Sequence, residues 1–137
     1  MKKILSLLGL TVALMLPLYS QQTNGAASTP PPNPWKLLEQ QSSDLAAGIK
    51  AQETHPLHAL DAAIGKETTD LQADSGTLPA DKKQAYEDGL KKLAELAHGI
   101  HVDGHHKQWD DATKKQAEFV AVLKQTEALV PDKAAGK

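Results

Sequence analysis

Apolar residues recur at steps of three and four along four stretches of the chain, the spacing of one face of an α-helix. These stretches predict helices at about residues 35–52, 56–73, 79–104 and 106–130. No stretch shows the alternation of β-branched and polar residues that a strand requires. Four amphipathic helices joined by short links predict an all-α protein, an antiparallel up-down-up-down four-helix bundle.

Short polar or helix-breaking segments separate the predicted helices. Pro56 suits the first turn of the second helix, and the segment 74–77 has the composition of a turn. Gly104 suits the left-handed position that follows a helix, so the third helix is expected to end there. His105 and His106 are then expected in the first turn of the fourth helix.

The start of the chain is typical of an exported protein. Two lysines precede an apolar run at residues 4–18, and small residues follow. This order predicts a secretory signal at residues 1–20, with cleavage after Ser20, Ala26 or Ala27. The run is short for a membrane span, which takes about 20 apolar residues. We therefore expect a periplasmic or secreted mature protein without a membrane segment, an uncleaved anchor being the alternative.

The remaining chain divides by composition into three parts. Residues 21–34 are polar and proline-rich, which predicts a disordered spacer. Residues 35–131 hold the four predicted helices and form the domain. Residues 132–137 are small and charged and are expected to be a flexible tail.

Composition limits the chemistry that the protein can perform. The chain has no cysteine, and its two methionines, Met1 and Met15, both lie in the predicted signal. Thiolate ligands, redox dithiols and covalent c-type haem attachment are therefore excluded for this chain. A bound transition metal would be held by imidazole, carboxylate, amide or water. The formal net charge of −2 gives no reason to expect a nucleic-acid partner.

Six histidines occur in two groups, beside the first and the third predicted links. In an up-down-up-down bundle these two links lie at the same end. The histidines are therefore expected to gather at one rim of the bundle. They are His55 and His58 in the first group, and His98, His101, His105 and His106 in the second.

Histidines three residues apart on a helix share a face and can bind one cation together. We predict His98, His101 and His105 as ligands, with His58 reaching across from the second helix. His55 and His106 are secondary candidates. Nearby carboxylates can act as ligands or can orient the imidazole rings. These carboxylates are Asp61, Asp103, Asp110 and Glu53.

Imidazole ligands without thiolates favour Zn²⁺, Cu²⁺, Ni²⁺ or Co²⁺. Only the neutral ring binds metal, so the affinity is expected to fall below about pH 6.5. The alternative interpretation is that these histidines are ordinary exposed residues near helix ends.

The segment Tyr86-Glu87-Asp88-Gly89-Leu90 leads to Asp103-Gly104 and then to a last helix rich in Ala, Lys and Gln. With the export signal and the helix lengths, this makes residues 36–130 resemble the periplasmic cytochrome b562 family. The resemblance implies a four-helix bundle holding one b-type haem between a Met of the first helix and a His of the last. Those two positions fall near Leu38 and Lys124, so the family's haem ligands are not carried over.

Three functions from different classes follow from these observations. The leading hypothesis is an exported metal-binding protein, a scavenger, buffer or carrier whose partner is the metal ion. The second is a b-type haem electron-transfer protein with two histidine ligands at the rim. The third is a structural or interaction module without a cofactor, either monomeric or dimeric. An enzyme is the least expected class, because no nucleophile, base and oxyanion donor occur together.

Overall fold

The computed structural model describes residues 33–131. The predicted signal, the tail at 132–137 and nearly all of the predicted spacer lie outside the described residues. Within the described part the protein is all-helical, as predicted, and contains no strand. Its elements are α1 (Pro34–Ala51), α2 (Thr54–Ala73), the short 3₁₀ helix η1 (Asp74–Thr77), α3 (Ala80–His105) and α4 (Trp109–Glu127).

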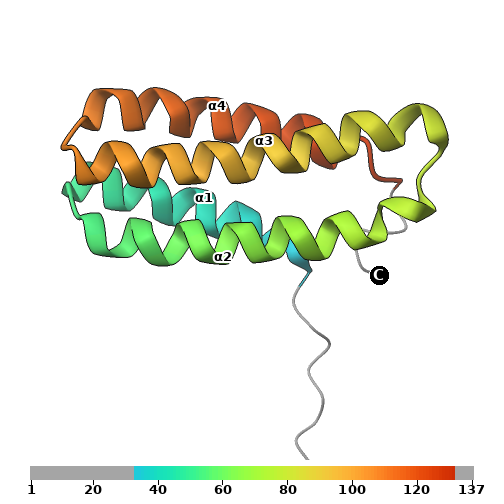
Figure 1. Ribbon diagram of the computed structural model, residues 1–137, viewed down its shortest axis with the longest axis horizontal. Helices are drawn as coiled ribbons and strands as arrows, with labels where there is room; N and C mark the ends of the chain where they lie inside the picture. Colours follow the sequence, from blue (N-terminus) through green and yellow to red (C-terminus); the bar gives the residue numbers. More distant parts are fainter. Residues whose placement is uncertain (1–32, 132–137) are drawn as a thin grey trace, which may run out of the picture. The chain divides into compact units, whose positions relative to one another are not determined.

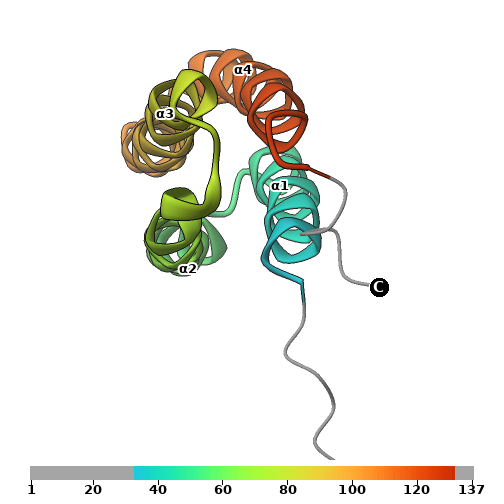
Figure 2. The ribbon, with the colours of Figure 1, turned by 90° about the vertical axis from the view of Figure 1, so that its right-hand side faces the viewer.

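The four α-helices lie side by side around a common core (Figures 1 and 2). α1 packs against α2 and α4, and α3 packs against the same two helices. The links after α1 and after α3 lie at one end, while the link between α2 and α3 lies at the other (Figure 1). The end with the first and third links is therefore where residues from the start of α2 and the end of α3 can meet.

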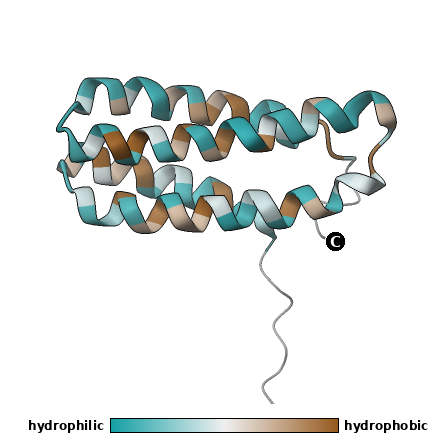
Figure 3. Cartoon of the chain, in the orientation of Figure 1, coloured by the Kyte–Doolittle hydropathy of each residue, from teal (hydrophilic) through white to brown (hydrophobic). Residues whose placement is uncertain are grey.

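Apolar side chains from all four helices fill the space between them, and apolar and hydrophilic residues recur along each ribbon (Figure 3). Full burial of one such leucine or isoleucine contributes about 1.5–3 kcal/mol, so this core supplies the main stabilisation. These buried residues recur at the steps of three and four that the sequence shows along each predicted helix. The largest fully buried apolar side chains are Leu38, Leu45, Leu57, Ile64, Leu90, Leu93, Ile100 and Phe119.

Among residues 33–131, none of the helices combines the length and the apolar character needed to cross a membrane.

The third helix runs further than its sequence predicts. Gly104 is a buried helical residue, not a left-handed one, and α3 ends at His105. Lys107 adopts the left-handed conformation instead, with φ of 58°. The Gln108 N–H then donates to the Asp103 carbonyl at 2.8 Å. This is the long hydrogen bond of a Schellman motif, which closes the last turn of the helix.

The second and fourth helices begin at other residues than predicted. α2 starts at Thr54, and Pro56 lies in its first turn, where an N–H has no helical partner to lose. α4 starts at Trp109, not at His106, because the preceding residues form the closing motif of α3. His105 is consequently the last residue of α3 and His106 its C-terminal cap, so neither belongs to the first turn of α4.

Two glycines allow α2 to approach its neighbours at the end of the bundle where the histidines lie. A Cβ atom at Gly48 of α1 would lie 3.0 Å from Leu57 Cδ2, and one at Gly104 of α3 would lie 2.6 Å from Leu57 Cδ1. Leu57 is fully buried. The glycines therefore hold the start of α2 close to α1 and α3, which places the next residue, His58, beside α3.

Replacing Tyr86 by Phe is expected to make the stability less sensitive to alkaline pH. Burial, and secondarily the charge of Asp74, raises the pKa of Tyr86 to about 12. Its hydroxyl donates to the Leu71 carbonyl at 3.3 Å. The folded protein holds the phenol proton more tightly than an unfolded chain, whose tyrosine pKa is about 10. The stabilisation of the folded state by this difference in pKa is therefore complete below about pH 10 and is lost as the pH rises toward about 12.

Urea unfolding at several pH values tests this expectation. Between about pH 8 and about pH 11 the free energy of unfolding of the wild type should fall by about 1 kcal/mol more than that of the Tyr86→Phe variant. Equal losses in the two proteins would mean that the Tyr86 phenol titrates alike in the folded and unfolded states.

Candidate metal centre

The facing sides of α2 and α3 carry two short rows of side chains able to bind metal. His58 and Asp61 lie three residues apart on α2, and His98, His101 and His105 lie three and four residues apart on α3. Residues at these spacings share one face of a helix. Because α2 packs against α3, the two rows meet.

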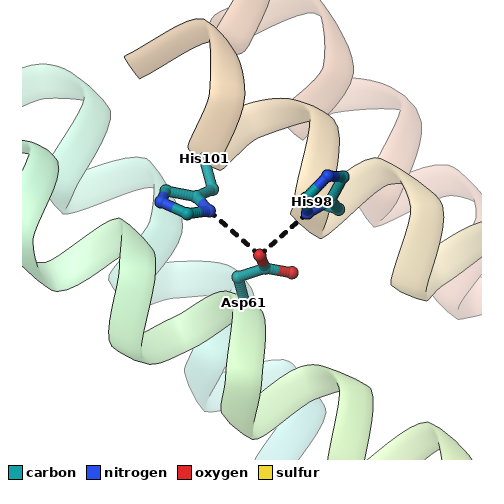
Figure 4. Close-up of side chains that lie close together, drawn as sticks. All are labelled: Asp61, His98 and His101. Atoms are coloured by element: carbon teal, nitrogen blue, oxygen red, sulfur yellow. Dashed lines mark hydrogen bonds and ion pairs between the residues drawn. The ribbon is translucent and has the colours of Figure 1, made fainter. Parts of the chain in front are cut away.

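Asp61 is the residue that joins the two rows. Its Oδ2 atom lies 3.0 Å from the Nδ1 atom of His98 and 3.0 Å from the Nδ1 atom of His101. The carboxylate of α2 therefore lies between the two imidazoles of α3, which point toward it (Figure 4). An ionised carboxylate only accepts hydrogen bonds, so these two contacts require the tautomer of each ring that carries its proton on Nδ1.

The three side chains differ in their access to solvent. The exposed fraction is 13% for the His101 side chain, 21% for Asp61 and 68% for His98. His101 is therefore the more deeply placed of the two imidazoles, and His98 lies further out. The centre is thus sheltered on the His101 side and open to solvent on the His98 side, where a hydrated cation has access.

Two further histidines lie beside His101. The Nδ1 atom of His58 is 3.3 Å from the Nε2 atom of His101, and the centroids of these rings are 4.9 Å apart. The His105 ring centroid lies 4.7 Å from that of His101. When His101 is neutral and donates from Nδ1, its Nε2 lone pair accepts from His58. Both ring nitrogens of His101 therefore have polar partners.

The geometry suits a cation held by Asp61, His98 and His101. Each residue offers one ligand atom, and these three atoms all lie within 4.8 Å of one another. Ligand atoms about 2.0–2.1 Å from a tetrahedral metal are about 3.3 Å apart. Two of the three separations are 3.0 Å and the third is no more than 4.8 Å, so a cation would fit between the three atoms once the side chains draw together and the Nδ1 protons move to Nε2 or to water.

The structure brings together four of the six histidines predicted as ligands: His58, His98, His101 and His105. His55, at the start of α2, and His106, after α3, are exposed. Within residues 33–131, neither makes a side-chain hydrogen bond or ring contact with the other four. Their positions in the sequence correctly placed them at the histidine end of the bundle, but the packing of the helices leaves them outside the cluster.

The carboxylates Asp61, Asp103 and Asp110, expected near the histidines, differ in whether they reach an imidazole. Asp103 is buried and its carboxylate accepts from the Lys115 ammonium of α4, so it ties α3 to α4 and does not orient an imidazole. Asp110 lies exposed in the first turn of α4. Among the carboxylates of residues 33–131, Asp61 alone contacts histidines, and it does so as a candidate ligand. The sequence feature that pointed to Asp61 was its spacing of three residues from His58, which matches the spacing of His98 and His101.

The haem-ligand positions of the cytochrome b562 resemblance hold different side chains. Leu38 is fully buried in the core, and Lys124 lines an open groove between α1 and α4. Neither residue is the Met or the His that the resemblance implies. The histidine cluster lies between α2 and α3, on other helices than that pair of positions.

The centre therefore combines one carboxylate and two imidazoles from neighbouring helices, with two more imidazoles beside them. Borderline divalent metals accept this mixture of nitrogen and oxygen donors. In comparisons with known proteins, the chain matches no protein-family model, no curated protein and no solved structure.

Proposed function

We propose that this protein is an exported up-down-up-down four-helix bundle that binds a divalent transition metal as a buffer or carrier. The ligands are Asp61, His98 and His101. The observation that carries the proposal is the meeting of three ligand atoms, from two different helices, within 4.8 Å of one another. Export to the periplasm or outside the cell rests on the sequence at residues 1–20.

The donor atoms favour some cations over others. Two imidazole nitrogens and one carboxylate oxygen suit Zn²⁺, Cu²⁺, Ni²⁺ and Co²⁺. Ca²⁺ and Mg²⁺ prefer oxygen ligands, and in this cluster Asp61 is the one residue that offers oxygen. We therefore expect selection for the transition metals over the alkaline-earth cations.

The position of the centre supports reversible binding. The exposed His98 imidazole leaves one side open to water, so a cation can exchange without unfolding of the bundle. Three protein ligands leave a fourth tetrahedral position for water or for a group on a receiving protein. Both properties suit a protein that holds a metal and releases it again.

Removing both imidazoles is expected to abolish tight binding. Metal-free, untagged wild-type protein should bind Zn²⁺ or Cu²⁺ saturably, with Kd below about 1 μM. The His98→Gln/His101→Gln variant should bind at least about 100-fold more weakly, because it retains one of the three ligands. Isothermal titration calorimetry at neutral pH measures both affinities, and circular dichroism checks that the variant is folded.

The matched control is His55→Gln/His106→Gln, which removes two exposed histidines outside the cluster. It should retain the wild-type affinity. If the His98→Gln/His101→Gln variant titrates like the wild type, or if the control loses as much affinity, the proposed centre is wrong.

A further inference from the structure

His101 faces polar partners with both of its ring nitrogens. Its Nδ1 atom contacts Asp61 Oδ2 at 3.0 Å, on the side of the proposed metal centre. Its Nε2 atom contacts His58 Nδ1 at 3.3 Å, on the other side of the ring. The two nitrogens of one imidazole diverge, so a ligand that uses Nε2 cannot occupy the same place as one that uses Nδ1.

The second contact has the dimensions of a metal site. Two ligand atoms about 2.0–2.1 Å from a tetrahedral cation lie about 3.3 Å apart. The observed separation of His58 Nδ1 and His101 Nε2 is 3.3 Å. The His105 ring lies beside His101, with 4.7 Å between centroids, and is exposed and free of the core. Among residues 33–131, only Asp61, His98 and His101 already bring three ligand atoms within 4.8 Å of one another, so the His105 side chain would have to turn to supply a third nitrogen here.

We propose a second transition-metal position formed by His58, His101 and His105, with His101 bridging the two cations. This inference rests on the proposed function, because the first cation is the one bound by Asp61, His98 and His101. A neutral imidazole carries a single N–H. When both nitrogens bind a cation, that proton is released to water and the ring becomes a bridging imidazolate.

Charge determines the order in which the two positions fill. The cluster holds a single carboxylate, Asp61, and this carboxylate lies in the first position. The second position has nitrogen ligands alone, and a cation already bound nearby repels the next one. The exposure of His58, His98 and His105 lets water screen that repulsion. The second cation is therefore expected to bind more weakly than the first, in a separate step.

Copper titration followed by native mass spectrometry and electron paramagnetic resonance tests this inference. The wild type should bind two Cu²⁺ ions per chain in two steps, and His58→Gln should bind one at the wild-type first affinity. His105→Gln should weaken the affinity for the second copper by about tenfold or more. His106→Gln should leave the affinities of both steps unchanged. An imidazolate bridge couples the two unpaired electrons, so the wild-type signal per bound copper should fall between one and two equivalents.

The outcomes separate this inference from the proposed function. Binding of one copper per wild-type chain, abolished by His98→Gln/His101→Gln, would overturn the second position and leave the proposed function standing. Two coppers in the His58→Gln variant would also overturn it. A wild-type signal that grows in proportion to bound copper up to two equivalents would overturn the bridge. No saturable binding by the wild type would contradict the proposed function itself.

Discussion

Replacing Asp61 by Asn is expected to weaken the binding of Zn²⁺ or Cu²⁺ by about 100-fold, at the upper end of what loss of one metal partner removes. The substitution keeps the size of the side chain but removes the one negative charge of the cluster. The amide oxygen can still accept from His98 or His101, so the metal-free fold should keep its free energy of unfolding within about 1 kcal/mol. The loss of affinity then reports the carboxylate as a ligand and not a change of fold.

Thermodynamic linkage gives an independent measure of the same effect. At a free metal concentration of about 100 times the wild-type Kd, the metal should raise the free energy of unfolding of the wild type by about 2.7 kcal/mol. The Asp61→Asn variant, with its weaker site, should gain about 0.4 kcal/mol at that concentration. Chemical denaturation with and without metal measures both values.

Asp70→Asn is the matched control, because Asp70 lies on the same helix and pairs with Lys66 on the exposed surface. It makes the same change of charge away from the histidines and should retain the full stabilisation by metal. Equal stabilisation of the wild type and Asp61→Asn would show that the carboxylate is not a ligand.

Replacing Gly89 by Ala is expected to destabilise the bundle by about 2–3 kcal/mol, as overpacking of a core does. A Cβ atom at Gly89 of α3 would overlap the Thr126 hydroxyl of α4 and lie 2.9 Å from Thr126 Cγ2. Thr126 is buried, β-branched and held by its hydrogen bond to the Val122 carbonyl at 2.8 Å, so it cannot rotate away freely. The two helices would have to separate locally.

Gly65→Ala supplies the matched control for this glycine substitution. Nothing lies within 4 Å of a Cβ atom at Gly65, which also lies inside a helix. This change should raise the free energy of unfolding by about 0.5–1 kcal/mol, because alanine favours the helix over glycine. Urea unfolding measures both variants. If Gly89→Ala is stabilised like Gly65→Ala, α3 and α4 do not pack this closely at Thr126.

The helices and most of their buried residues were predictable because helical periodicity is a local property. Leu38, Leu90 and Phe119 repeat with their neighbours at helical steps, and burial follows directly from that repetition. The helix ends were less predictable. Gly104 resembled a terminator by residue type, but it lies inside α3 with Leu57 packed against it, and Lys107 is the left-handed residue instead.

The candidate site was predictable as a group of histidines at one end, but not as a set of ligands. His98 and His101 share a face by their spacing alone. The pairing of Asp61 with them depends on how far α2 is shifted along α3, and that register follows from the packing of Leu57 between Gly48 and Gly104. Periodicity in one helix carries no information about this shift.

His105 shows the same division most plainly. Its identity as a metal-binding residue type was evident from the chain, yet the end of α3 decides which face it joins. Because α3 continues through Gly104 to His105, His105 continues the row of His98 and His101 and lies beside the His101 ring. Local patterns thus predict which residues are able to bind a metal. The three-dimensional packing of α2 against α3 determines which of them meet, because a site requires distances between atoms that belong to different helices.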